Sequence, residues 1–158
     1  MITDDLQDKL ERLIESRGLR LYGLEFIRTG HERTFRIYIH SKDGINLTHC
    51  EEISDLVSPL LDVELEAVDS YNLEVSSPGI ERVLKEERHF RCSLGEMVEA
   101  KLLDNRGVVR GRLKDYARDD DGDYVELDGV DSAEAVDGCL RLRIRECKRI
   151  RTFFVWND

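Results

Sequence analysis

Apolar residues near the start of the chain recur with the spacing of one face of an α-helix. The apolar stripe consists of Leu6, Leu10, Leu13 and Ile14. Thr3 precedes the stripe and can cap the helix, and acidic residues occupy the first turn. Gly18 follows the stripe and is a typical helix-ending residue. The pattern predicts a first amphipathic helix that ends at Gly18.

Two stretches after this helix are rich in the aromatic and β-branched residues of β-strands. They are LRLYGLEFIR (residues 19–28) and RTFRIYIHS (residues 33–41), joined by the short polar segment 29–32. The alternating apolar positions expected to face a core from the second strand are Phe35, Ile37 and Ile39. Gly23 interrupts the alternation in the first strand and indicates a β-bulge. We expect a β-hairpin.

The segment NLTHCEEISDLVSPLLD (residues 46–62) predicts a second helix. Its apolar stripe consists of Ile53, Val57, Leu60 and Leu61. Thr48 and Glu51 have the spacing of a capping box. Pro59 should weaken the last turn, because its ring removes a backbone donor and disfavours helical geometry at the preceding residue.

A third strand is expected at residues 71–76, where apolar and polar side chains alternate again. The order helix, strand, strand, helix, strand predicts a small α+β layer, with two helices covering one face of a sheet.

The pattern changes from about Lys85 onward. Short strand-like runs follow one another at residues 95–103, 108–116, 123–130 and 139–146, and a helical period is conceivable only near Ala133. Short strands at this spacing predict a small all-β barrel. We therefore expect an N-terminal α+β domain at residues 1–84, with a net charge of −8, and a C-terminal barrel domain at residues 85–158, with a net charge of −2.

The overall composition is that of a globular protein, because the net charge of −10 comes from 24 basic residues mixed among 34 acidic ones. No apolar run is long enough to suggest a membrane span, and an acidic start argues against a secretory signal, so we expect a cytoplasmic protein. The four cysteines form no CxxC pair, which favours reduced thiols over disulfides or a metal site.

Ser76 and Ser77 raise the question of a catalytic nucleophile. No G-x-S-x-G elbow surrounds them, and no local pattern assigns a histidine as the base. Residues 77–80 instead have the chemistry of a type II turn, with Pro78 at the second position and Gly79 supplying a positive φ at the third. Such a turn could still offer amides and hydroxyls to a phosphate or a carboxylate, and the sequence leaves that open.

A basic stripe is expected near the C-terminus, because Arg141, Arg143 and Arg145 alternate with apolar residues on a predicted strand. These arginines could contact phosphates or an acidic partner. The alternative is a solvated outer face balanced by the acidic residues of segment 119–123. That segment, DDDGD, lacks the spacing of a calcium loop and is interpreted as a solvated loop.

Aromatic residues near the C-terminus, Phe153, Phe154 and Trp156, could form a ligand face. We favour the interpretation that they pin the terminal segment to the core.

The stretch YNLEVSSPGIERVL (residues 71–84) resembles the signature of the RimP family of bacterial ribosome maturation factors. The resemblance extends over nearly the whole chain and includes the first helix, GLRLYGLEF, FRIYI, HCEEISDLVSPLLD and HFRCSLGEMVEAKL. Glu81 and Val83 depart from the Asp and Pro usual in the family, so the segment after the turn should be less rigid. From about Gly107 the similarity is weak.

The resemblance implies a two-domain protein, with an N-terminal α-β-β-α-β domain followed by a small all-β SH3/Sm-like barrel. It implies a non-enzymatic protein, expected to be monomeric and without cofactor or metal, that binds the immature small (30S) ribosomal subunit and assists its assembly. It also implies a link to small-subunit ribosomal protein twelve. The candidate ribosome contacts in the signature are Ser76, Ser77, Pro78, Gly79 and Arg82.

The distribution of charge suggests how such a protein would work. A net charge of −10 opposes tight non-specific binding to RNA and favours a basic ribosomal protein as partner, with the acidic N-terminal block as the contact. The arginines at 141, 143 and 145 are then the candidate contact with rRNA. The alternative is a free-standing Sm-like RNA-binding module.

Overall fold

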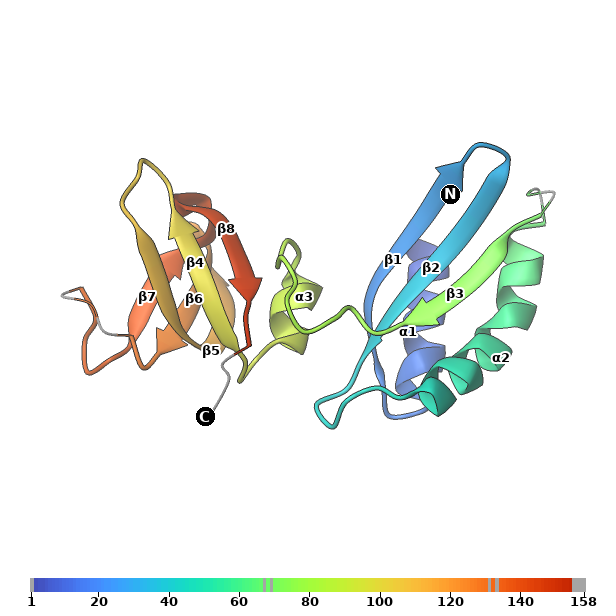
Figure 1. Ribbon diagram of the computed structural model, residues 1–158, viewed down its shortest axis with the longest axis horizontal. Helices are drawn as coiled ribbons and strands as arrows, with labels where there is room; N and C mark the ends of the chain where they lie inside the picture. The colour runs from blue at the N-terminus through green and yellow to red at the C-terminus, as the bar shows by residue number, and fades with distance from the viewer. Residues whose placement is uncertain (1, 67, 69, 131, 133, 155–158) are drawn as a thin grey trace. The chain divides into compact units, whose positions relative to one another are not determined.

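The computed structural model describes residues 2–66, 68, 70–130, 132 and 134–154. The chain divides into two compact units, Met1–Pro78 and Gly79–Asp158 (Figure 1). This division falls six residues before the boundary expected at residue 84, because residues 79–84 pair with the last strand of the second unit. Leu84 N donates to Ile150 O at 2.8 Å, and Thr152 N donates to Arg82 O at 3.0 Å.

The N-terminal unit has the predicted order of elements: α1 (Asp4–Glu15), β1 (Arg20–Thr29), β2 (Glu32–His40), α2 (Leu47–Glu64) and β3 (Asn72–Ser76). The sheet order is β1-β2-β3. β1 and β2 form the expected antiparallel hairpin, whereas β3 is parallel to β2 and needs α2 as the crossover. Both helices lie on one face of the sheet (Figure 1). The α+β prediction for this region is confirmed.

The core of this unit lies between the helices and the sheet. It contains the predicted stripe residues Leu6, Leu10, Ile14, Phe35, Ile37, Ile39, Ile53, Val57 and Leu61. Thr3 caps α1 by accepting a hydrogen bond from Leu6 N at 3.2 Å. The strand ladder shifts register between Leu21 and Gly23, which confirms the predicted bulge.

The capping box predicted for α2 at Thr48 and Glu51 is wrong. The helix begins at Leu47, so its N-cap is Asn46 and the third helical residue is His49. Asn46 Oδ1 accepts from His49 N at 2.9 Å, and His49 Nδ1 accepts from Asn46 N at 3.1 Å. Asparagine is a good cap, and the imidazole nitrogen replaces the carboxylate expected at the third position.

The C-terminal unit contains α3 (Glu87–Cys92), β4 (Met97–Leu102), β5 (Val108–Asp119), β6 (Gly122–Asp128), β7 (Leu140–Arg143), the short 3₁₀ helix η1 (Ile144–Glu146) and β8 (Cys147–Thr152). Its five strands form one antiparallel sheet in the order β7-β6-β5-β4-β8. The core includes Phe90, Val98, Ala100, Leu113, Val125, Leu127 and Ile150.

A closed barrel, which the sequence predicted, is not formed by the described strands. β7 and β8 lie at opposite ends of the strand order, and no ladder joins them within the described residues. The physical reason is that β7 has only 4 residues and runs into η1, after which β8 pairs with β4. α3 was not predicted, and the helical period considered near Ala133 lies at a residue outside those described.

Candidate functional site

The signature turn connects the two units. β3 ends at Ser76, Pro78 closes the first unit and Gly79 opens the second. Gly79 has φ of +90°, a left-handed conformation that residues with a Cβ atom rarely adopt. A positive φ is what the third position of the predicted type II turn requires.

Arg82 is held within the C-terminal unit. Its guanidinium donates to the carboxylate of Glu96, to Ser93 Oγ at 2.8 Å and to Gly79 O at 3.1 Å. Its backbone N–H donates to Thr152 Oγ1 at 3.1 Å. Only 7% of the Arg82 side chain is exposed. The Arg82 side chain therefore serves mainly to attach the segment after Gly79 to the C-terminal unit.

The basic stripe predicted at Arg141, Arg143 and Arg145 is split between two elements. Arg141 and Arg143 lie on β7, but Arg145 lies in η1, so the expectation that all three share one strand is wrong. The strand stops because β7 turns into the 3₁₀ helix after Arg143.

The β5–β6 connection holds two of these arginines, one through a carboxylate and the other through a backbone carbonyl. Arg143 donates to both carboxylate oxygens of Asp119, at 2.5 and 2.8 Å, and Arg145 donates to Asp121 O at 2.6 Å. The hydrogen bond from Arg143 lowers the pKa of Asp119. Arg143 is therefore balanced by segment 119–123, as the alternative expected, whereas the hydrogen bond of Arg145 leaves its charge without a carboxylate from that segment.

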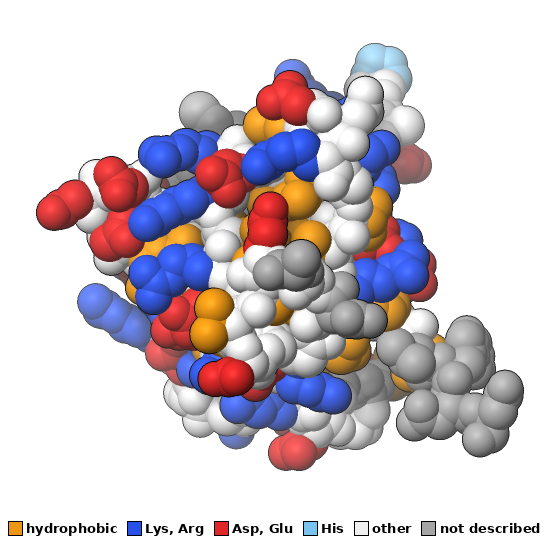
Figure 2. Space-filling view, turned by 90° about the vertical axis from the view of Figure 1, so that its left-hand side faces the viewer, with side chains coloured by type: hydrophobic (Ala, Val, Ile, Leu, Met, Phe, Trp, Pro, Cys, Tyr) orange, Lys and Arg blue, Asp and Glu red, His pale blue; other side chains and the backbone are white. Residues whose placement is uncertain are grey.

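Arg141 also has local partners. It donates to Glu126 Oε1 at 2.9 Å, and its guanidinium carbon lies 4.2 Å from the centroid of the Tyr124 ring. The space-filling view shows the same kind of mixture, with acidic and basic side chains lying next to one another over the visible face (Figure 2).

A second group of basic residues lies on the outer face of β4, β5 and β8. We call it the basic sheet face, and it consists of Lys101, Arg110, Arg112, Arg149 and Arg151. The strand register places Arg110 and Arg151 on either side of Glu99, and Lys101 directly opposite Arg149. The alternate residues of the same strands are buried, including Val98, Ala100, Leu113 and Ile150. The face therefore carries five cations, with Glu99 between two of them and Glu81 3.6 Å from Arg151.

Glu99 is the acidic residue at the centre of this face, and 10% of its side chain is exposed. It accepts hydrogen bonds from Arg110 Nε at 2.8 Å and from Arg151 Nε at 3.3 Å. The hydrogen bond from Arg110 is the main cause of a lowered Glu99 pKa, with a further contribution from Arg151. Glu99 therefore stays ionised and holds the two arginines in place.

Lys101 and Arg149 carry positive charge that no side chain of the described residues neutralises. Neither side chain makes an ion pair or hydrogen bond with the described residues, and like charges directly opposite each other on neighbouring strands are destabilising. Their charge is available to an external anion. Sequence reasoning missed this face because residues near 101 and 149 meet only through the β4–β8 pairing.

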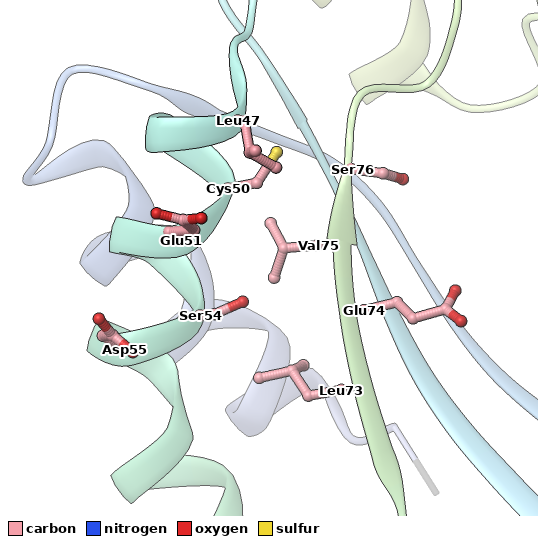
Figure 3. Close-up of a pocket in the computed structure, with 9 residues that line it drawn as sticks. All are labelled: Leu47, Cys50, Glu51, Ser54, Asp55, Leu73, Glu74, Val75 and Ser76. Carbon is pink, nitrogen blue, oxygen red and sulfur yellow. The ribbon is translucent and has the colours of Figure 1, made fainter.

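A groove of about 640 Å³ lies between α2 and β3 of the N-terminal unit. Leu73 and Val75 point from β3 toward the helix, and Ser54 points from α2 toward the strand (Figure 3). Glu51 and Asp55 line the α2 side. The 18 residues of α2 include five carboxylates and no Lys or Arg, so the helix side of the groove is strongly acidic.

The described residues contain no group of three or more His, Cys, Asp or Glu side chains that could hold a metal ion. All four cysteines lie among them and are free thiols. Burial raises the pKa of Cys147 to about 11 and also raises the pKa of Cys50. Both groups are protonated at neutral pH, which does not favour thiolate chemistry.

The predicted aromatic residues near the C-terminus have separate placements. Phe153 N donates to Met97 O at 3.1 Å, which ties this segment to β4, and Phe154 is exposed. Trp156 lies outside the described residues. No helix in the described part of the chain has the length and apolar character needed to cross a membrane.

Comparison with protein-family models matches residues 9–81 to the RimP N-terminal domain. The matched segment runs from α1 through β3 and across the signature turn, and it contains the acidic groove. The resemblance inferred from YNLEVSSPGIERVL is thereby confirmed. Residues 9–81 of the chain are therefore a RimP N-terminal domain, the domain of a family of ribosome maturation factors.

Proposed function

We propose that the protein binds the immature small (30S) ribosomal subunit and assists its assembly. The observation that carries this proposal is the match of residues 9–81 to the RimP N-terminal domain. In this proposal the protein acts by binding, as a monomer in the cytoplasm and without a cofactor. Its partners are the small-subunit precursor, small-subunit ribosomal protein twelve and rRNA.

The N-terminal unit is the proposed contact for the ribosomal protein. Residues 1–78 contain 16 acidic and 8 basic residues, a net charge of −8. Ribosomal proteins that bind rRNA need basic surfaces, and opposite charge raises the rate of encounter between partners. An acidic unit of this kind can shield a basic protein until it reaches its RNA site.

The C-terminal unit is the proposed contact for rRNA, and it offers two candidate surfaces. The first is Arg141, Arg143 and Arg145, and the second is the basic sheet face. The second is favoured because Lys101 and Arg149 have no partner among the described residues, whereas Arg141 forms an ion pair with Glu126 and Arg143 forms one with Asp119. Phosphate binding needs cations that the protein has not already neutralised.

We also propose that this unit is an SH3/Sm-like fold with an open sheet. Four consecutive strands follow one another, and the fifth returns to pair with the first, which is the support for this assignment. In the signature turn, Ser76, Ser77, Pro78 and Gly79 are proposed as ribosome contacts. Arg82 belongs to the same contact region but acts mainly through the Glu96 pair that holds the segment.

Sedimentation of cell extract tests the main proposal. The protein should migrate with free small subunits and be absent from translating ribosomes. Two triple variants, each removing three positive charges, then separate the RNA surfaces. The first variant combines Lys101→Gln, Arg112→Gln and Arg149→Gln, and it should bind small-subunit precursors more weakly. The salt slope, which is the slope of log binding constant against log salt concentration, should become shallower by about two units. Arg141→Gln with Arg143→Gln and Arg145→Gln serves as the matched control.

An equal loss in the two triple variants would mean that net charge, and not the basic sheet face, determines binding. A loss confined to the Arg141 set would assign the rRNA contact to β7 and η1. Absence of the wild-type protein from small-subunit fractions would count against the maturation-factor proposal itself.

The second candidate function is a free-standing Sm-like RNA-binding module. The basic sheet face favours it, because its five cations outnumber the two carboxylates that pair with them, Glu99 and Glu81, and could bind RNA without any ribosomal protein. Measured affinity for purified RNA, combined with absence from small-subunit fractions, would select this alternative.

A further inference from the structure

β3 leaves one edge of the N-terminal sheet open. The strand order β1-β2-β3 places β3 at the end, with only β2 as its partner among the described strands. Its outward backbone groups can therefore pair with another strand. The opposite edge strand, β1, contains a bulge beside Gly23, a feature that discourages pairing.

The residues of β3 do little to block such pairing. Exposed edge strands are commonly protected by Lys, Pro or a bulge. Asn72–Ser76 contains no Lys and no Pro, and its register with β2 is continuous. The charged residue of β3 is Glu74, which pairs with Arg36 Nε of β2 at 2.8 Å. The edge is regular and open, as strand-adding sites are.

The groove beside this edge can receive one row of side chains from an added strand. Side chains of an extended segment alternate between two faces. One row would enter the groove between α2 and β3, against Leu73 and Val75 (Figure 3). Leu47, which also lines the groove, is 74% exposed and supplies further apolar surface. The other row would lie on the face of Glu74, which points away from α2 (Figure 3).

Acidic side chains meet the row that enters the groove. Glu51 and Asp55 line the helix side of the groove, whereas Glu74 on the opposite face is already paired with Arg36. α2 contributes no Lys or Arg that would offset its carboxylates. The charge favours a segment rich in Lys or Arg and repels the phosphates of a nucleic acid.

We propose that the free edge of β3 and the α2–β3 groove form a docking site for an extended, Lys/Arg-rich protein segment that joins the sheet as a fourth strand. Main-chain hydrogen bonds to β3 supply the alignment, and the acidic groove selects the basic side chains. The proposal deepens the proposed function, on which it rests for the nature of the partner, a basic ribosomal protein.

The first experiment uses a short synthetic peptide in which Lys and Val alternate, titrated into the full chain and followed by fluorescence anisotropy. Reversing the groove charge with Glu51→Lys and Asp55→Lys should weaken binding about tenfold. Glu15→Lys with Glu52→Lys is the matched control. It makes the same charge change at two exposed helix positions, Glu15 on α1 and Glu52 on α2, that are not among the groove residues. Circular dichroism of both variants checks that the fold is retained.

The second experiment detects strand pairing directly. Hydrogen–deuterium exchange at Asn72–Ser76 should slow when the peptide is added, because free edge amides become hydrogen-bonded. The same peptide with alternate backbone nitrogens methylated along its pairing edge should not bind. Binding that leaves exchange at β3 unchanged, or that survives methylation, overturns strand addition. If the groove and control variants weaken peptide binding equally, the groove carboxylates are not the contact for the basic side chains.

These results are separable from the proposed function. If the peptide fails to bind while the chain still migrates with free small subunits, the docking site is wrong and the maturation-factor proposal stands. If the peptide binds at β3 but the chain is absent from small-subunit fractions, the docking site stands and its assignment to a ribosomal protein is wrong.

Discussion

The guanidinium of Arg82 and the carboxylate of Glu96 form a two-point ion pair inside the C-terminal unit. Both terminal nitrogens of Arg82 donate to Glu96, and one of them also donates to Ser93 Oγ. Only 7% of the Arg82 side chain is exposed. This pair anchors the segment that follows Gly79 beside β8, where Thr152 bonds to the Arg82 backbone.

Replacing Arg82 with lysine should therefore destabilise the C-terminal unit by about 2 kcal/mol, because an ammonium cannot reproduce the forked hydrogen bonds in a largely buried position. Denaturant unfolding measures the change. Arg91→Lys on α3 is the control, since Arg91 pairs with Glu87 in an exposed i,i+4 position and should change stability little. Equal effects of the two substitutions would contradict the anchoring role.

Gly79→Val should lower the thermal unfolding midpoint. Gly79 has φ of +90°, and nothing lies within 4 Å of the position that an added Cβ would take, so the cost comes from backbone strain rather than from a clash. The expected loss of unfolding free energy is about 1–2 kcal/mol. For a unit of this size, each kcal/mol lowers the midpoint by roughly 4–8 °C. An unchanged midpoint would mean that the turn does not need a positive φ.

Glu99→Gln should change stability and RNA affinity in opposite directions. The substitution removes the carboxylate that receives Arg110 and Arg151, so the unfolding free energy should fall by about 1 kcal/mol. It also removes the acidic residue from the basic sheet face, so binding to RNA phosphates should strengthen and its salt slope should become steeper. Denaturant unfolding and RNA titration at two salt concentrations measure both effects. A parallel fall in stability and affinity would argue that the face is not an RNA contact.

The Tyr116–Asp123 pair should give stability a defined pH range. Hydrogen bonds from Arg118 and Tyr116 lower the pKa of Asp123 to about 2, and burial together with the bond to Asp123 raises the pKa of Tyr116 to about 12. The contribution of Asp123 is present above its unfolded pKa of about 4 and is lost as the pH falls toward 2. The contribution of Tyr116 is present below about pH 10 and is lost as the pH rises toward 12.

Asp123→Asn tests this pair. Its stability should fall below that of the wild type between about pH 4 and 10, and the difference should shrink as acid protonates Asp123 in the wild type. Carboxyl ¹³C shifts of Asp123 measure its pKa directly. A titration midpoint near 4 would contradict the pairing.

Local patterns were sufficient where a residue's role depends on near neighbours. Leu6, Leu10 and Ile14 are one helical face because of their spacing, and all three are buried. The same holds for Phe35, Ile37 and Ile39, which share one side of a strand. Even the bulge beside Gly23 follows from a break in alternation. α3 escaped prediction because its 6 residues bury only Phe90 and Cys92, too few to give a period.

The sequence by itself determined the order of elements in the N-terminal unit, the positive φ of Gly79 after β3 and, through YNLEVSSPGIERVL, the resemblance to the RimP domain. Periodicity and turn chemistry act over a few residues, and so they can be read along the chain. Only the tertiary structure decided that Arg82 is committed to Glu96, that Arg143 is neutralised by Asp119, and that Lys101 faces Arg149. Each of these relationships joins residues on different elements. Whether a charged side chain is neutralised depends on its neighbours in space, which strand pairing brings together from distant parts of the chain.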